Sequence, residues 1–260
     1  MPELPDVEVY RRRLAQGGLH RAIAKVLVPD RTVLRGVNGA ALARALRGRA
    51  LVGTGRRGKH LFAETSDQTT LVMHFGMTGV LQVDGQPSMP ASYVRLVLQL
   101  ADGGALSLLD PRRLGFVTVV EDVAAYCQQH DLGPDALDLR VGDLRALLRG
   151  HRGGLKAVLM DQSLVAGIGN IYSDEILFQA RLDPRRPASG LDDAEVRRLH
   201  RQLLRVLQLA ADRGADPSSF PMGWLMQHRN DGAACPRGHG AIRKVQLGGR
   251  GAYYCPDCQS

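Results

Sequence analysis

Apolar and polar positions change their spacing along the chain, and the first change falls after about twenty residues. From Pro5 to about Ala22, apolar residues are mixed with three consecutive arginines, which is the pattern of an amphipathic helix with a charged face. From about Ala24 to Val120, short runs rich in β-branched residues are separated by turn signals such as Asp102-Gly103-Gly104. This second region predicts an antiparallel sandwich or barrel, with a helix inserted at Val37 to Leu46. Its strands are predicted at Leu71–Phe75, Val80–Val83, Tyr93–Leu100 and Ala105–Leu109.

The spacing of apolar residues becomes helical from about Asp131 to Arg213. Turns that contain glycine or proline divide this region, and Asp192 or Asp193 is a candidate cap for its last helix. The tail after Gly232 is rich in glycine and cysteine and too short to build a core of its own. Four helices are predicted: Ala136–Arg149, Lys156–Asp161, Ile171–Ala180 and Asp192–Arg213. We therefore expect three domains, at residues 1–125, 126–231 and 232–260.

Length and composition favour a soluble globular protein. The 260 residues are enough for two domains with separate cores, and 44% of them are apolar and 23% charged. No apolar run approaches the roughly 20 residues that span a bilayer, and the N-terminus lacks the basic and apolar regions of a secretion signal. We expect a cytoplasmic protein without a membrane partner, whose four cysteines are free thiols or metal ligands rather than disulfides.

The net charge of +8 indicates a polyanionic partner, because a basic surface gains affinity by releasing counterions from phosphates. Most of the basic residues are arginines, but an excess of arginine can simply reflect a GC-rich genome. The net charge, rather than the arginine content, is therefore the observation that favours a nucleic acid as the partner.

The cysteine-rich tail has the spacing of a metal site. A Cys-x3-His pair is followed, after fifteen intervening residues, by a Cys-x2-Cys pair. Two ligand pairs separated by a short hairpin can place four nitrogen and sulfur donors tetrahedrally around Zn²⁺. The hairpin is predicted from Ile242–Gln246 and Gly251–Tyr254, with its turn near Gly248-Gly249, and a segment this short should need the metal to fold. The sequence predicts one structural zinc ion, with His239 the least regular ligand in a set of four: Cys235, His239, Cys255 and Cys258.

The first residues carry candidate chemistry. If Met1 is removed, as is usual before a small residue, the nitrogen of Pro2 becomes a free secondary amine. Free α-amino groups titrate at about pH 8, so an uncharged fraction can attack an electrophilic carbon such as a sugar C1′ at neutral pH. The resulting iminium ion makes neighbouring protons acidic, and Glu3 is a possible proton donor and acceptor beside it. The alternative interpretation is a flexible leader before the first helix.

The segment from Asp161 to Glu175 joins two predicted helices through a turn that contains Gly167 and Gly169. These glycines let the backbone approach another group closely, and Asn170 begins the second helix. Exposed amides at the start of a helix bind anions such as phosphate. The alternative interpretation is a tight connection between helices that binds nothing.

In combination, these motifs resemble the formamidopyrimidine-DNA glycosylase and endonuclease VIII family of DNA repair enzymes along nearly the whole chain. The resemblance implies an α+β multidomain fold: an N-terminal helix and antiparallel β-sandwich, a helix–two-turn–helix domain and a zinc finger, with DNA in the cleft between. The motifs that carry it are Pro2-Glu3-Leu4-Pro5, Gly58-Lys59-His60-Leu61, His74-Phe75-Gly76-Met77-Thr78-Gly79, Asp110-Pro111-Arg112-Arg113, Asp161 to Glu175 and the cysteine-rich tail.

The resemblance implies a role for individual residues. Pro2 corresponds to the nucleophile that attacks C1′ of the damaged nucleotide and forms a Schiff base, and Glu3 to the acid and base that assists it. Lys59 corresponds to a sheet lysine near the lesion and its phosphates, and Arg250 to the finger arginine that grips the flanking phosphates. The strand would then be cleaved by β-elimination and δ-elimination. Further DNA contacts are implied for His74, Lys156 and Asn170 at phosphates, Met77 as an intercalating residue, Arg112 facing the orphaned base, and Leu114 as a third wedge.

The chain departs from the formamidopyrimidine pattern in several places. Leu114 stands where phenylalanine is usual, and Asp6 where glutamate is common. The segment 214–229 is shorter than the loop that closes over a flipped base, and the pair His228-Arg229 resembles endonuclease VIII. This segment holds four large apolar residues, which either cover a lesion or pack on the sandwich: Phe220, Met222, Trp224 and Leu225.

The sequence thus favours a monomeric, nucleoid-associated enzyme of bacterial type that acts on damaged double-stranded DNA. One alternative is a non-catalytic, damage-directed DNA-binding paralogue of the same fold. A more distant one is a zinc-ribbon RNA-binding protein, which leaves the first 120 residues unexplained. Pro2, Glu3 and Lys59 favour the enzyme, because a binding protein has no need of a nucleophile together with an acid.

Overall fold

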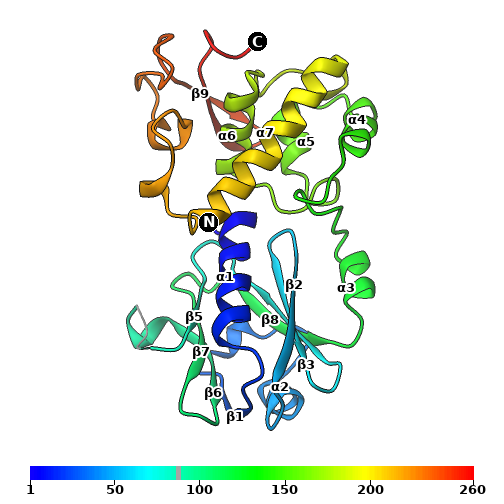
Figure 1. The fold of residues 1–260 in the computed structure, drawn as a ribbon, viewed down its shortest axis with the longest axis vertical. Helices are drawn as coiled ribbons and strands as arrows, with labels where there is room; N and C mark the ends of the chain where they lie inside the picture. Colours follow the sequence, from blue (N-terminus) through cyan, green and yellow to red (C-terminus); the bar gives the residue numbers. More distant parts are fainter. Residues whose placement is uncertain (86–88) are drawn as a thin grey trace. The chain divides into compact units, whose positions relative to one another are not determined.

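The computed structural model describes residues 1–85 and 89–260, which form two compact units (Figure 1). The first unit comprises residues 1–2 and 6–130, and the second comprises residues 3–5 and 131–260. Each unit contains a hydrophobic core of its own. Among the helices of the described residues, none combines the length and the apolar character that a bilayer span requires.

The first unit packs two four-stranded antiparallel sheets face to face. One sheet has the strand order β1-β6-β7-β5 and the other β2-β3-β4-β8. Leucines from both sheets meet in one core, together with one face of the first helix. The strands are β1 (Ile23–Leu27), β2 (Leu51–Arg57), β3 (His60–Thr65), β4 (Thr70–His74), β5 (Val80–Val83), β6 (Val94–Leu100), β7 (Ala105–Leu109) and β8 (Phe116–Val120). The helices are α1 (Leu4–Gly17), α2 (Gly39–Leu46) and α3 (Val123–Gln129), with 3₁₀ turns at Arg31–Val33 and Ala91–Tyr93.

Strand alternation decides which side chains of the first unit reach its core. In β3, Leu61 and Ala63 are buried between the sheets, and His60 and Phe62 lie on the opposite face. Tyr126 of α3 covers that face, with ring centroids 5.8 Å from His60 and 6.0 Å from Phe62. The helix α3 was not predicted from the sequence.

Helix α1 is tied to β2 through Glu8. The Glu8 carboxylate accepts hydrogen bonds from Arg11 at 2.7 Å, Arg12 at 2.9 Å and Arg56 at 3.2 Å. Burial raises the pKa of Glu8, but these guanidinium groups outweigh it and lower the pKa to about 2. The ion-paired cluster therefore keeps its charge at neutral pH and fixes the helix against the sheet.

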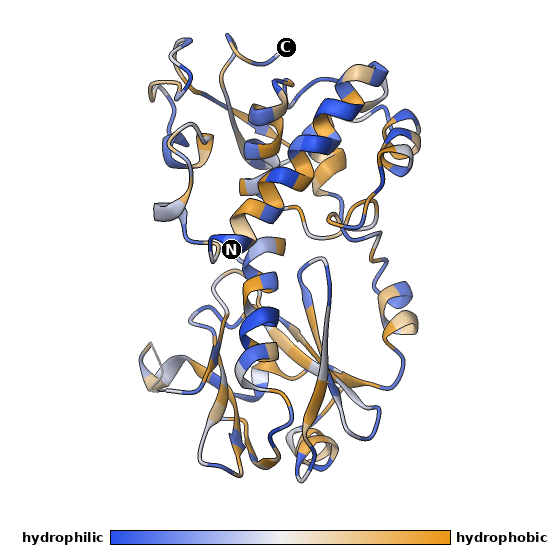
Figure 2. Ribbon diagram, in the orientation of Figure 1, coloured by the Kyte–Doolittle hydropathy of each residue, from blue (hydrophilic) through white to orange (hydrophobic). Residues whose placement is uncertain are grey.

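The second unit is helical and ends in a two-stranded antiparallel hairpin. Its helices are α4 (Val141–Arg149), α5 (Leu155–Met160), α6 (Asn170–Ala180) and α7 (Asp193–Asp212), with 3₁₀ turns at Ala188–Gly190, Pro217–Ser219 and Leu225–His228. The hairpin consists of β9 (Arg243–Leu247) and β10 (Arg250–Tyr254), and Gly248-Gly249 forms its turn as predicted. Helix α6 is almost entirely buried, whereas α7 alternates hydrophilic and hydrophobic bands along its length (Figure 2). Asp192 caps α7 in a capping box with Glu195, which confirms one of the two predicted caps.

Several predicted boundaries are wrong. The first helix ends at Gly17 instead of near Ala22, because Gly17 and Gly18 have the lowest helix propensity short of proline. The helix predicted from Val37 starts at Gly39, with the Asn38 side chain accepting a hydrogen bond from the Ala41 amide. The helix predicted from Ala136 starts only at Val141, because the Ala136 amide donates to the carbonyl of Ala166.

Three of the four large apolar residues of segment 214–229 belong to the core of the second unit and do not pack on the sandwich. Phe220 and Trp224 are buried with ring centroids 4.8 Å apart, and Leu225 packs beside Phe178 of α6. Met222 is different, since 86% of its surface is exposed. Three of the four residues therefore serve packing within the helical unit, and one projects into solvent.

Candidate functional site

The Glu3 carboxylate occupies the start of helix α6. Its Oε2 accepts hydrogen bonds from the amides of Gly169 at 2.8 Å and Tyr172 at 3.2 Å, and its Oε1 accepts one from Ile171 at 2.9 Å. The side chain is buried, with 1% of its surface exposed. Three backbone donors and the positive end of the helix dipole thus hold one carboxylate in a single position.

Gly167 and Gly169 let the backbone before α6 lie close to Leu4 and Glu3. A Cβ on Gly169 would lie 2.3 Å from Cδ of Glu3. Gly167 adopts φ +115°, a conformation that favours glycine, and its carbonyl accepts a hydrogen bond from the Leu4 amide at 3.1 Å. The predicted close approach at these glycines is confirmed, and an anion does lie at the helix start, but it is not the predicted phosphate. The amides of Gly169, Ile171 and Tyr172 bind the chain's own carboxylate, so they are not exposed to a phosphate.

Asn170 lies at the first position of α6, beside this carboxylate. Its backbone carbonyl accepts hydrogen bonds from Lys156 at 3.3 Å and Arg229 at 3.5 Å. Its side-chain Oδ1 is buried and has no hydrogen-bond partner among the described residues. A buried amide oxygen without a donor is uncommon, so this side chain has unused capacity for a further contact.

Lys156 is turned into the protein. The side chain is buried, and its ammonium forms an ion pair with Asp174 of α6. The same Nζ lies 3.4 Å from the carbonyl of Gly251, next to Arg250. Burial lowers the pKa of Lys156, and Asp174 opposes that shift. In this arrangement Lys156 connects α5, α6 and the hairpin.

Asp174 makes three contacts, one of which joins the hairpin to α6. Besides Lys156, it accepts hydrogen bonds from the Arg229 guanidinium at 2.8 Å and from the Tyr253 amide at 3.2 Å. Arg250 is exposed on β10 and borders a groove of about 280 Å³ that Lys156 also lines. The buried Asp174 therefore holds the strand that carries the exposed Arg250 through the Tyr253 amide.

Glu175, the residue after Asp174, binds the segment that precedes the hairpin. Its carboxylate accepts hydrogen bonds from Gln179 at 2.8 Å and from the amides of Met226 at 2.8 Å and Leu225 at 3.3 Å. Burial raises the pKa of Glu175 to about 7, although these donors act in the opposite direction. The neighbouring carboxylates of α6 thus hold different parts of the chain: Asp174 binds the hairpin at Tyr253, and Glu175 binds the amides of Leu225 and Met226.

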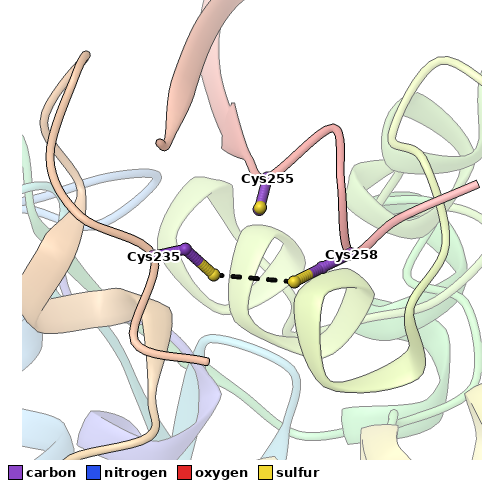
Figure 3. Close-up of side chains that lie close together, drawn as sticks. All are labelled: Cys235, Cys255 and Cys258. Carbon is purple, nitrogen blue, oxygen red and sulfur yellow. Dashed lines mark hydrogen bonds between the residues drawn. The ribbon is translucent and has the colours of Figure 1, made fainter. Parts of the chain in front are cut away.

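Three cysteine thiols of the tail form a cluster. The Sγ atoms of Cys235, Cys255 and Cys258 lie within 4.8 Å of one another, and their side chains point toward a common centre (Figure 3). His239 is nearby, with Nδ1 3.2 Å from Sγ of Cys258. Cys127 is half-buried and lies in the other unit. Three sulfur donors with an adjacent imidazole form a donor set that suits a tetrahedral metal ion.

In the first unit, Lys59 and His74 lie near one end of the sheet that contains β3 and β4. Gly58 and Lys59 form the turn between β2 and β3, and His60 pairs with His74 across the strands. The Nδ1 of His74 accepts a hydrogen bond from the Gly76 amide at 3.2 Å. Burial lowers the pKa of His74 to about 4, with further contributions from Lys59 and Arg35. The ring is therefore neutral at pH 7 and carries its proton on Nε2, where it can donate a hydrogen bond.

Met77, Arg112 and Leu114 are exposed on two turns of the first unit. Asp110 joins these turns, because its Oδ1 accepts a hydrogen bond from Thr78 at 2.6 Å and its Oδ2 accepts from the amide of Leu114 at 2.8 Å. The contact is close enough to require glycine at position 76, where a Cβ would lie 2.4 Å from the backbone of Leu114. The three exposed side chains thus project from one hydrogen-bonded platform.

Comparisons with known proteins place this geometry in a family. The family model of the formamidopyrimidine-DNA glycosylase N-terminal domain matches residues 1–117, and that of the formamidopyrimidine-DNA glycosylase H2TH domain matches residues 132–221. The chain belongs to the formamidopyrimidine-DNA glycosylase family. This confirms the resemblance, the fold and the enzyme class that the sequence predicted.

Individual relatives match along nearly their whole length. The formamidopyrimidine-DNA glycosylase of Moorella thermoacetica is 39% identical over 99% of this chain and 92% of its own. That of Thermus thermophilus is 37% identical over 100% of this chain and 98% of its own. The structure of wild-type Lactococcus lactis Fpg with N7-benzyl-Fapy-dG DNA is 29% identical, covers 100% of both chains and has a TM-score of 0.88. The complex of Lactococcus lactis Fpg with abasic-site DNA is 28% identical, covers 99% of both chains and also has a TM-score of 0.88.

Within this family fold, sequence reasoning missed the residues that position the others. Asp110, Asp174 and Glu175 stand inside motifs that the sequence singled out, yet no role was predicted for them. A signal existed for Asp110, since an aspartate directly after a strand and before proline is typical of a residue that accepts amides of a turn. The roles of Asp174 and Glu175 depend on segments about 50 to 80 residues later in the chain, to which local spacing gives no clue.

Proposed function

We propose that this chain is a bifunctional DNA glycosylase and AP lyase that excises oxidised bases from double-stranded DNA. The observation that carries the proposal is the Glu3 carboxylate, buried and held by three amides, directly after Pro2 in the sequence. A carboxylate bound in one place next to a prospective amine nucleophile matches what acid–base assistance of C1′ substitution requires. The Lactococcus lactis complexes with Fapy-dG and abasic-site DNA support damaged DNA as the partner.

The proposed reaction uses the secondary amine of Pro2 after removal of Met1. The nitrogen attacks C1′, the damaged base leaves with the electrons of the glycosidic bond, and Glu3 assists proton transfer while the sugar ring opens. The resulting iminium ion acidifies C2′, and loss of a C2′ proton expels the 3′ phosphate. A second elimination expels the 5′ phosphate and leaves a one-nucleotide gap with a phosphate at each end.

The remaining predicted residues are proposed to hold the duplex while a base is turned out. Lys59, His74 and Arg250 would bind phosphates, with Lys156 and Asn170 close to the same backbone. Lys156 would contribute less to phosphate binding than the other cations, because its ammonium is paired with Asp174. Met77 and Leu114 would enter the base stack, and Arg112 would face the orphaned base. We propose that the chain acts as a monomer.

Borohydride trapping tests this proposal. Purified protein that starts at Pro2 is mixed with duplexes that carry an abasic site, 8-oxoguanine or an oxidised pyrimidine, and the adduct is mapped by mass spectrometry. We expect a covalent adduct at Pro2, and the lesion that gives it fastest identifies the preferred substrate. Binding to damaged DNA without an adduct on any duplex would instead establish the non-catalytic paralogue.

We further propose that the thiol cluster and His239 hold one structural Zn²⁺. The distances between the three thiols and the imidazole contact at Cys258 support this ligand set. When bound, the ion would close the base of the hairpin that presents Arg250. It would supply folding energy to this segment and take no part in the reaction.

Removal of the metal ligand Cys255 should weaken DNA binding. We expect Cys255→Ser to lose the bound metal and at least about tenfold in affinity for abasic-site DNA, because the hairpin around Arg250 loses its closure. Elemental analysis gives the zinc content, and fluorescence anisotropy gives the affinity. Cys127→Ser is the matched control, since Cys127 lies outside the cluster. This variant should retain both the metal and the affinity for DNA. Full metal content in Cys255→Ser would contradict the ligand assignment.

A further inference from the structure

Arg35 lies beside the strand end that carries His74. Its guanidinium carbon is 4.2 Å from the ring centroid of Phe116, and that ring is stacked on His74 with centroids 5.2 Å apart. The backbone is fixed as well, because the Arg35 amide donates to the carbonyl of Val117 at 3.0 Å. The position of this arginine is therefore set by strand β8.

Arg35 is an exposed residue, and its guanidinium makes no ion pair or side-chain hydrogen bond among the described residues. Other arginines of the same unit are tied to carboxylates, such as Arg56 to Glu8 and Arg95 to Asp30. Stacking on an aromatic face holds a guanidinium in one plane and leaves the donors on its edge available. That geometry suits a two-point hydrogen bond to phosphate oxygens.

The surroundings of Arg35 are positive. Lys59 directly precedes His60, which pairs with His74 across the strands, and Arg35 and Lys59 both act to lower the pKa of His74. Asp110 acts in the opposite direction, but its carboxylate already accepts hydrogen bonds from Thr78 and from backbone amides of residues 112, 114 and 115. A phosphate at this end of the sheet would therefore meet two cations and the Nε2 proton of a neutral imidazole.

We propose that Arg35, stacked on Phe116, binds a phosphate of the DNA backbone together with Lys59 and His74. This rests on the proposed function, and it adds a residue that no motif had marked. The ligand class is a phosphodiester, recognised by its charge and oxygens and not by base sequence. Arg35 is thus a binding residue without a part in bond breaking.

The salt dependence of DNA binding tests the proposal. Affinity for a duplex with a tetrahydrofuran abasic-site analogue is measured at several salt concentrations for wild type and for Arg35→Gln. Because each neutralised phosphate contributes about 0.9 to the slope of log affinity against log salt, we expect Arg35→Gln to lose about that amount. Its affinity at low salt should fall about tenfold. Arg35→Lys should keep the slope, since it keeps the charge.

The matched control is Arg44→Gln, which removes the same charge from an exposed position on α2. Arg44→Gln should leave the slope at the wild-type value. Equal slopes for Arg35→Gln, Arg44→Gln and wild type would overturn the role of Arg35 while leaving DNA binding intact. Absence of salt-dependent binding in wild type would overturn the proposed function as well, so the two failures are distinguishable.

Discussion

Glu3→Gln should slow removal of an intact damaged base by about a thousandfold, while cleavage at a preformed abasic site falls by less than about tenfold. The amide cannot exchange a proton with the opening sugar. It also replaces one carboxylate oxygen with an NH₂ group that faces a backbone donor, because both oxygens of Glu3 accept amides of α6. An abasic site has already lost its base and needs only Pro2 and the elimination steps. Rates on the two substrates, measured under single-turnover conditions, give the ratio that checks this.

Two further variants separate chemistry from folding. Pro2→Gly removes the proposed nucleophile and should reduce cleavage of both substrates together with borohydride trapping. Glu8→Gln removes another buried carboxylate of α1, one that pairs with arginines, and should lower stability without changing the ratio of the two rates. Equal losses on both substrates in Glu3→Gln would show that Glu3 serves the whole reaction and not base removal in particular.

Gly169→Ala should lower base excision by about a hundredfold although no catalytic group is altered. The added Cβ would lie 2.3 Å from Cδ of Glu3 and 2.5 Å from its Oε1, so the carboxylate must move away. The backbone at Gly169 has φ −123°, which alanine adopts readily, so the effect is steric and not conformational. Displacement of a catalytic group by about 1 Å is enough for a loss of this size.

The matched control is Gly142→Ala in α4, where an added Cβ meets nothing within 4 Å. Excision rates of both variants are compared at equal folded fractions, which circular dichroism establishes. The double variant Gly169→Ala with Glu3→Gln should be little worse than Glu3→Gln, because both changes act through one carboxylate. Full activity in Gly169→Ala would show that the held position of Glu3 does not matter for excision.

Local signals account for the parts of the site that the sequence could predict. The hairpin β9–β10 and the clustered cysteines follow from spacings of a few residues, and the turn at Gly248-Gly249 was found in the same way. The close approach at Gly167 and Gly169 was also predicted, since glycine lets the backbone come close to another group. The group that lies against these glycines is Glu3. Local spacing could not predict it, because Glu3 lies more than 160 residues earlier in the chain.

The sequence by itself determined the succession of a first helix, a β-rich region and a helical region, the metal-binding spacing and, through its motifs, the family. Only the tertiary structure decided which polar groups meet: Glu3 at the amides of α6, Lys156 turned inward to Asp174, and Arg35 stacked on Phe116. The physical reason is one of range. Periodicity and turn chemistry act over a few residues, whereas a buried or stacked charge takes the partner that packing brings to it from anywhere in the chain.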